Sequence, residues 1–115
     1  MEKSSLTALV REQLDLATRA SSGRSAHTVY GGHEHVLRQT LIALNAGQRM
    51  DEHENPGEAT VFVLSGEVEL GSGDSVWSGS EGDLLDVPDA RHHLLAKTDA
   101  TVLLTSVKRR SGLTA

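Results

Sequence analysis

Residue types that could bind a metal ion gather in one short stretch of the chain. DEHENPGE, at residues 51–58, contains His53, Asn55 and Glu58 immediately ahead of an apolar run. Imidazole nitrogens and carboxylate oxygens are common ligands of transition metals. The stretch therefore has two interpretations: the rim of a metal site, or a polar turn that leads into an ordinary core strand.

Three further polar side chains could contact a small molecule. Arg38 and Gln39 are adjacent in the apolar segment VLRQTLIAL, so strand alternation predicts that one of them faces inward. An inward Gln39 could hold a polar group of a substrate, and an inward Arg38 would indicate a carboxylate substrate. The other interpretation puts Arg38 on an outer sheet face or in a dimer contact. Arg91 is expected at the mouth of the fold, where it would clamp an acidic ligand or pair with a nearby aspartate.

Composition excludes several function classes. The chain has 115 residues and a formal net charge of −5, which suits one domain and offers no basic field for nucleic acid. It contains no cysteine, so thiolate metal sites and cysteine nucleophiles are excluded. Residues 1–20 lack the apolar region of a signal peptide, and no apolar run approaches the length of a membrane span. We therefore expect a cytoplasmic protein.

The elements that must position these residues follow from the hydrophobic pattern. Apolar residues three and four apart predict an amphipathic helix over 5–20, and SSGRS at 21–25 ends it. From residue 26 onward, short β-branched runs between turn residues predict about eight strands. Turn-forming sequences at 71–74, 78–83 and 97–100 predict tight hairpins, and hence antiparallel pairing. The fold class predicted is an all-β jelly roll with one N-terminal helix.

Two motifs in the β region resemble those of the cupin superfamily, over residues 36–107. In the first, Gly47 is followed at the motif spacing by His53 and then Asn55, and Gly66 closes the motif. The second motif is GDLLDVPDARHH, which ends at His93, and an alanine replaces the last glycine of the motif. The resemblance implies a double-stranded β-helix barrel over 23–110, preceded by a helix and linker at 1–22 and followed by a tail at 111–115.

The resemblance also implies where a metal would lie. Cupins typically hold one metal ion with three histidines and one glutamate on the inner wall of the barrel, and His53 and His93 match two of these histidines. Asn55 stands where another histidine would be, and Ala59 stands where the glutamate would be. Glu58 is one position away, and strand alternation turns it outward unless NPGE forms a bulge. By the same alternation, His92 should point away from His93, toward the surface.

Three functions remain open from these observations. With Glu58 turned inward, His53, Glu58 and His93 would form a two-histidine, one-carboxylate set for Fe, Mn, Ni or Zn, in an oxygenase or isomerase. Without metal, the same cavity would serve a non-catalytic binder or sensor of a small molecule. The third possibility is a structural or regulatory dimer whose N-terminal helix contacts a partner. Cupin-like barrels tend to bury a sheet face against a second copy, which predicts a homodimer.

Overall fold

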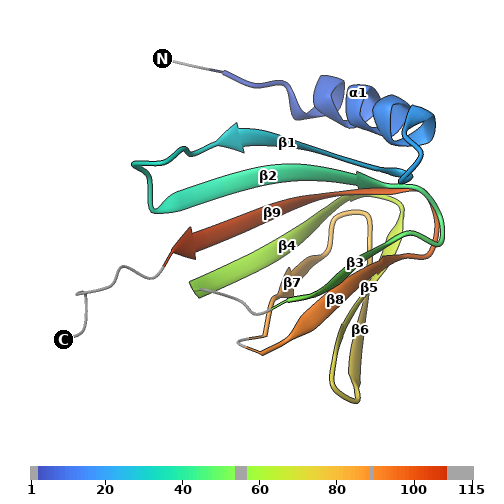
Figure 1. Ribbon diagram of the computed structural model, residues 1–115, viewed down its shortest axis with the longest axis vertical. Helices are drawn as coiled ribbons and strands as arrows, with labels where there is room; N and C mark the ends of the chain where they lie inside the picture. The colour runs from blue at the N-terminus through green and yellow to red at the C-terminus, as the bar shows by residue number, and fades with distance from the viewer. Residues whose placement is uncertain (1–2, 54–56, 89, 109–115) are drawn as a thin grey trace.

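Two antiparallel β-sheets face each other in the computed structural model, and one helix lies on the outer side of the larger sheet (Figure 1). The structure describes residues 3–53, 57–88 and 90–108, without the side chains of residues 51–53. Its elements, in chain order, are α1 (Leu6–Arg19), β1 (Arg24–Tyr30), β2 (Leu37–Leu44), β3 (Arg49–His53), β4 (Gly57–Ser65), β5 (Glu67–Ser72), β6 (Ser75–Ser80), β7 (Leu84–Asp86), β8 (His92–Ala96) and β9 (Ala100–Lys108). The predicted fold class, all-β with one N-terminal helix, is confirmed.

The two sheets exchange strands in a jelly-roll order. The larger sheet has the order β1-β2-β9-β4-β7, and the smaller one has the order β3-β8-β5-β6. The hairpin predicted at 71–74 joins β5 to β6, which pair with each other. The turns at 78–83 and 97–100 instead carry the chain from one sheet to the other, because β7 pairs with β4 and β9 pairs with β2 and β4. Both were wrongly predicted as hairpins, since a turn sequence specifies a reversal and not the partner strand.

Strand β3 was not predicted from the sequence. Its residues, RMDEH, lack the alternation of apolar and polar side chains that marks a half-buried strand. Met50 is packed against the core and pairs with Leu94 of β8. Pairing with β8 therefore defines this strand, rather than its own composition.

Helix α1 covers the outer face of the larger sheet. Ser5 is its N-cap, since the Ser5 hydroxyl accepts a hydrogen bond from the backbone N–H of Ala8 at 3.2 Å. Gln13 and Ala17 are buried where the helix contacts β1 and β2. The apolar stripe read from the sequence thus packs on the chain's own sheet. Among the described residues, no helix has the length and apolarity needed to span a membrane.

Strand β2 presents different residues to the two sides of its sheet. On the inner face, toward the smaller sheet, it places Arg38, Thr40, Ile42 and Leu44, and Ile42 and Leu44 belong to the buried core. The alternate residues face the helix side, where Leu41 and Ala43 are completely buried. The core lies between the sheets, and a second buried layer lies under the helix.

The two sheets approach each other closely at one edge and diverge at the other. At the close edge, a Cβ added to Gly79 of β6 would lie 3.0 Å from Cδ1 of Leu85 and 3.2 Å from Cγ2 of Val63. At the opposite edge, between the β1–β2 pair and Met50 of β3, a pocket remains open. The lack of a side chain at Gly79 lets the sheets close on one side, and the open side is where a ligand could enter.

Candidate functional site

A small cavity lies between the sheets, and one imidazole reaches it. Its volume is about 30 Å³, close to the space that one water molecule occupies. The cavity is lined by seven apolar side chains and one histidine: Ile42, Met50, Val61, Leu70, Val87, His92, Leu94 and Leu104. It offers a single strongly polar side chain in an apolar surrounding.

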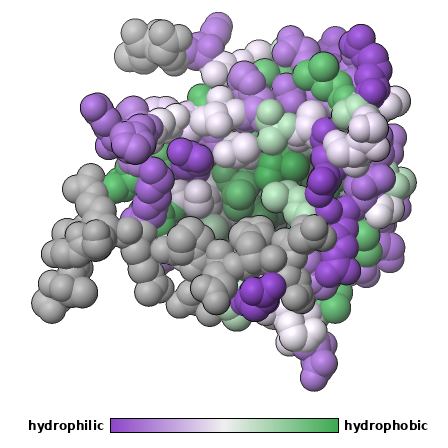
Figure 2. All heavy atoms as spheres, viewed as in Figure 1, coloured by the Kyte–Doolittle hydropathy of each residue, from purple (hydrophilic) through white to green (hydrophobic). Residues whose placement is uncertain are grey.

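A larger pocket adjoins this cavity at the open edge of the sandwich. It has a volume of about 400 Å³ and shares Ile42, Met50 and Leu104 with the inner cavity. Thr40 and Arg24 also line it, from the inner face of the β1–β2 pair. Figure 2 shows hydrophobic surface in a hollow in the middle of this side of the molecule, with more hydrophilic residues above it and to its right. This size is within the range typical of small-molecule sites.

His92 is the buried polar residue of the cavity. It begins β8 and is 6% exposed, and Leu94 and Ala96 follow it on the same inner face. Its Nδ1 lies 2.9 Å from the backbone carbonyl oxygen of Ala90. Because a carbonyl can only accept, Nδ1 carries the proton, and in the neutral ring Nε2 bears the lone pair. The Ala90 carbonyl thus fixes the orientation of the imidazole ring at the cavity wall.

The expectation that His92 lies on the surface, with His93 in the cavity, is therefore wrong. His93 lies on the outer face of β8, where it is half-buried and pairs in register with Gly71. A side chain at Gly71 would collide with the His93 ring, so the glycine makes room for it. The Nδ1 atom of His93 is buried without a hydrogen-bond partner. The structure does not bring His93 to the cavity, because β8 alternates with His92 inward.

His53 ends β3 directly opposite His92. The pairing of the two strands shifts by one residue between Met50 and His53, so that His53 and His92 are register partners. The side chain of His53 lies outside the described part of the structure, and so does the whole of Asn55.

Glu58 lies away from this cavity. It is exposed and pairs with Val107 on the outer face of the larger sheet. Ala59, its neighbour, packs against the core, and Val61 and Val63 follow it inward. Strand β4 is regular from Gly57 to Val63, so the bulge that would turn Glu58 inward is not formed. Among the described residues, no group of three or more His, Cys, Asp or Glu side chains could hold a metal ion.

Arg38, rather than Gln39, occupies the inner face of β2. Arg38 pairs with Ser106 of β9, and Ser106 pairs with Ala59, which packs against the core. Arg38 therefore lies on the same inner face. Gln39 lies on the outer face, where its Nε2 donates to Oγ1 of Thr105 at 3.3 Å. Arg38 is exposed, at the end of the inner face. The interpretation that put Arg38 on an outer face is wrong.

Arg91 lies just before β8. Its side chain is exposed, and its backbone carbonyl accepts a hydrogen bond from the Ser72 hydroxyl at 2.8 Å. His33 and His35 are exposed, and the His35 ring meets Tyr30 edge-on at 5.2 Å between centroids. None of these residues lines the cavity or the larger pocket.

The cavity residue that sequence reasoning missed is His92. The motif count favoured His93, and the two leucines that follow leave the strand phase ambiguous. One signal was present: Lys97 has the same parity as His93, and a lysine is rarely buried. Lys97 is indeed exposed, and its Nζ lies 3.4 Å from Oε2 of Glu69. The parity of Lys97 therefore favours an inward His92, but Lys97 lies just beyond β8, so only strand pairing fixes the phase.

Comparison with solved structures reveals similar proteins. An RmlC-like cupin from Desulfovibrio desulfuricans is 30% identical over 73% of this chain and 81% of its own, with a TM-score of 0.64. A conserved protein of unknown function from Streptococcus pyogenes is 27% identical over 80% of each chain, with a TM-score of 0.69. Salicylate 1,2-dioxygenase from Pseudoaminobacter salicylatoxidans is 20% identical over 92% of this chain and 34% of its own, with a TM-score of 0.72, which shows the shared fold alone. No family model and no curated protein sequence matches the chain.

Proposed function

The chain belongs to the cupin superfamily, and from that premise we propose that it binds a small, mainly apolar molecule between its sheets, oriented by His92. The observation that carries this proposal is the burial of one imidazole in a cavity whose other lining side chains are apolar. The Ala90 carbonyl already binds Nδ1 of His92, so the support lies in the position of the imidazole, which gives an otherwise apolar wall one polar group that could orient a ligand.

The shape of the site sets the size of the ligand. The inner cavity has room for one small group, and the adjoining pocket of about 400 Å³ has room for a body of several carbon atoms. A hydroxyl or similar polar group in the inner cavity would meet the His92 side chain, which lines it. The apolar body would then contact Ile42, Met50 and Leu104, which the two spaces share.

Octanol is a suitable probe for this arrangement, because it combines one hydroxyl with an apolar chain. We expect octanol to shift the methyl NMR signals of Ile42, Met50 and Leu104, with a saturable binding curve. His92→Leu should weaken binding about fivefold, as the loss of one hydrogen bond predicts. The control is His33→Leu, which replaces an exposed histidine outside the pocket. Absence of saturable shifts in the wild-type protein would contradict the proposal.

A divalent metal ion at the same site is the second candidate function, favoured by the register pairing of His53 with His92. The donation from Nδ1 of His92 to a backbone carbonyl is also the arrangement common among metal-bound histidines. His92 and His53 would hold the ion, and Fe, Mn, Ni or Zn would supply a Lewis acid for an oxygenase or isomerase reaction. Glu58 faces outward, so other groups would have to supply the remaining ligands.

Elemental analysis of protein purified without a tag or chelator separates the two candidates. Near-stoichiometric metal that is lost in both His53→Ala and His92→Ala, but kept in His93→Ala, would support a metal site. His93→Ala is a matched control, because it removes the neighbouring imidazole on the opposite face of β8. Metal-free, folded wild-type protein would exclude the metal candidate and leave the first proposal standing.

A further inference from the structure

Two cationic side chains lie at one end of the inner face of the larger sheet. Arg38 is the next inner-face residue beyond Thr40, which lines the larger pocket. Successive residues on one face of a strand are about 7 Å apart, within the reach of an arginine side chain. Arg38 is therefore placed at the end of the pocket, next to its described lining.

Lys108 belongs to the same row on the neighbouring strand. It lies two residues beyond Ser106, the register partner of Arg38, and its backbone N–H donates to the Val36 carbonyl at 3.0 Å. Diagonal neighbours across two antiparallel strands are about 7 to 8 Å apart, so long side chains at these positions can meet one group. Arg38 and Lys108 could thus contact the same functional group of a ligand.

Among the strand side chains that the structure describes, no carboxylate shares a face with this pair. Of the strand residues whose side chains are described, each Asp and Glu lies on an outer face: Glu58, Glu67, Glu69 and Asp86. No ion pair of Arg38 or Lys108 is formed within the described part of the chain. Among the described side chains, the inner face consequently carries positive charge at this end, above an apolar pocket.

We propose that the ligand of this pocket is an amphipathic anion, a carboxylate with an apolar tail, whose carboxylate binds Arg38 and Lys108. This inference rests on the proposed function, since it needs a pocket that admits the tail. An arginine fork matches a carboxylate in two parallel hydrogen bonds, and a nearby lysine adds a point charge. The apolar tail then extends past Thr40 toward Ile42 and Leu104.

The Arg38 end is better suited to an anion than the Arg24 end. Arg24 also lies on the inner face and lines the pocket, but its Nη1 donates to the backbone carbonyl of Arg49 at 3.1 Å. At the other end, Gly31 crosses Arg38 closely: a Cβ on Gly31 would lie 3.0 Å from Cα of Arg38. Gly31 thus lies against the backbone of Arg38, and the Arg38 side chain is exposed.

Matched eight-carbon probes test the inference in the full-length protein. Octanoate, octanol and octylamine differ in the charge of one terminal group and share the apolar chain. We expect octanoate to bind the wild-type protein about tenfold more tightly than octanol by calorimetry, and octylamine to bind most weakly. In Arg38→Met and Lys108→Met the preference for octanoate over octanol should fall. The affinity for octanol should stay within about twofold of the wild-type value, because methionine keeps the apolar part of the replaced side chain. Arg11→Met, at an exposed position of helix α1, is the matched control, and Arg24→Met tests the opposite end of the pocket.

The outcomes are distinguishable. Equal affinity for octanoate and octanol, or an octanoate preference that survives in both Arg38→Met and Lys108→Met, would overturn the inference while octanol binding still supports the proposed function. Loss of the preference in Arg24→Met alone would place the carboxylate at the opposite end and also overturn it. If neither octanoate nor octanol binds the folded wild-type protein, the proposed function and the inference fail together.

Discussion

The two faces of the larger sheet are covered in different ways. On the outer face, Leu41, Ala43 and Thr101 are completely buried, on the side where helix α1 lies. On the inner face, Thr40 and Leu104 are only half-buried and line a pocket that opens to solvent. The same pair of strands therefore packs densely under the helix, and on its inner face it carries both core residues and the lining of a pocket.

This difference separates stability from binding in one sheet. Dense packing contributes to stability because each buried carbon makes many contacts. A side chain beside a pocket makes fewer such contacts. Substitutions of the buried residues under the helix should then change the free energy of unfolding, and substitutions of the half-buried residues that line the pocket should mainly change ligand affinity.

The largest expected effect is a leucine truncation that compares the two faces. We expect Leu41→Ala to lower the free energy of unfolding by about 3 kcal/mol, because a completely buried leucine leaves a cavity. Leu104→Ala should cost less, about 1 kcal/mol, because Leu104 is half-buried beside an existing pocket. Urea unfolding followed by circular dichroism measures both. Equal losses would show that the two faces do not differ in packing.

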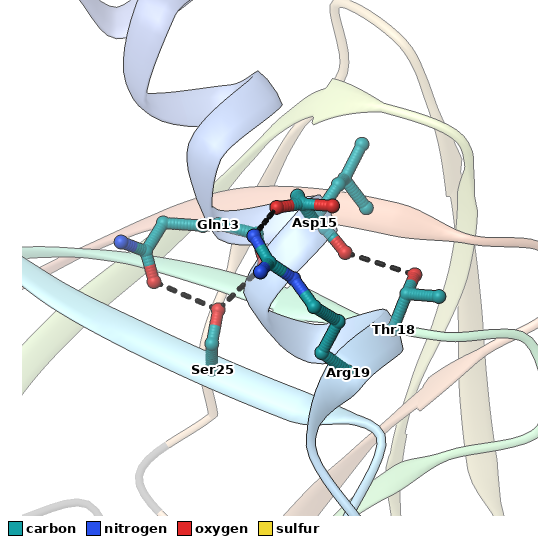
Figure 3. Close-up of polar contacts among 6 residues, drawn as sticks. Gln13, Asp15, Thr18, Arg19 and Ser25 are labelled. Atoms are coloured by element: carbon teal, nitrogen blue, oxygen red, sulfur yellow. Dashed lines mark hydrogen bonds and ion pairs between the residues drawn. The ribbon is translucent and has the colours of Figure 1, made fainter.

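An intermediate effect is expected where the helix meets β1. The Ser25 hydroxyl lies 2.8 Å from the backbone carbonyl oxygen of Gln13 and 2.7 Å from its Oε1 (Figure 3). Because Gln13 is 6% exposed, Ser25→Ala would leave a buried acceptor unsatisfied and cost about 1 to 2 kcal/mol. Thr28→Ala, at an exposed position of the same strand, is the control. A loss no larger than that of Thr28→Ala in urea unfolding would contradict this account of the contact.

The smallest effect is expected on the exposed side of the helix. Asp15 and Arg19 form an ion pair one turn apart, also drawn in Figure 3, and both side chains are more than half exposed. Water screens such a pair, so Asp15→Asn should cost about 0.3 kcal/mol. The loss should disappear at high salt, because salt screens exposed charges. If Asp15→Asn lowered the free energy of unfolding by more than Ser25→Ala does, and independently of salt, buried and exposed contacts would not differ as we expect.

Much of the fold could be read from local patterns. The helix predicted over 5–20 is found at Leu6–Arg19, since apolar spacing and a serine cap are local features. Strand alternation correctly assigned Glu58 and Ala59 to opposite faces of β4. Strand β3 escaped prediction because it depends on pairing with β8.

The site was harder to predict than the fold. Motif spacing led to His93, but counting residues along the chain does not reveal how the loop before β8 sets the phase of that strand. The pairing of Leu94 with Leu70 and with Met50 fixes the phase, since it brings Leu94 into the core and His92 into the cavity. For Arg38 and Gln39, alternation showed that one must face inward, and only the register with β9 identified Arg38.

The sequence by itself determined the all-β class, the N-terminal helix and the alternation within each strand, because each depends on residues a few positions apart. It also excluded thiolate chemistry, since the chain has no cysteine. Only the tertiary structure decided which of two adjacent histidines reaches the cavity and which turns join the two sheets. Those choices depend on pairing between strands far apart in the chain, where a shift of one residue exchanges the two faces.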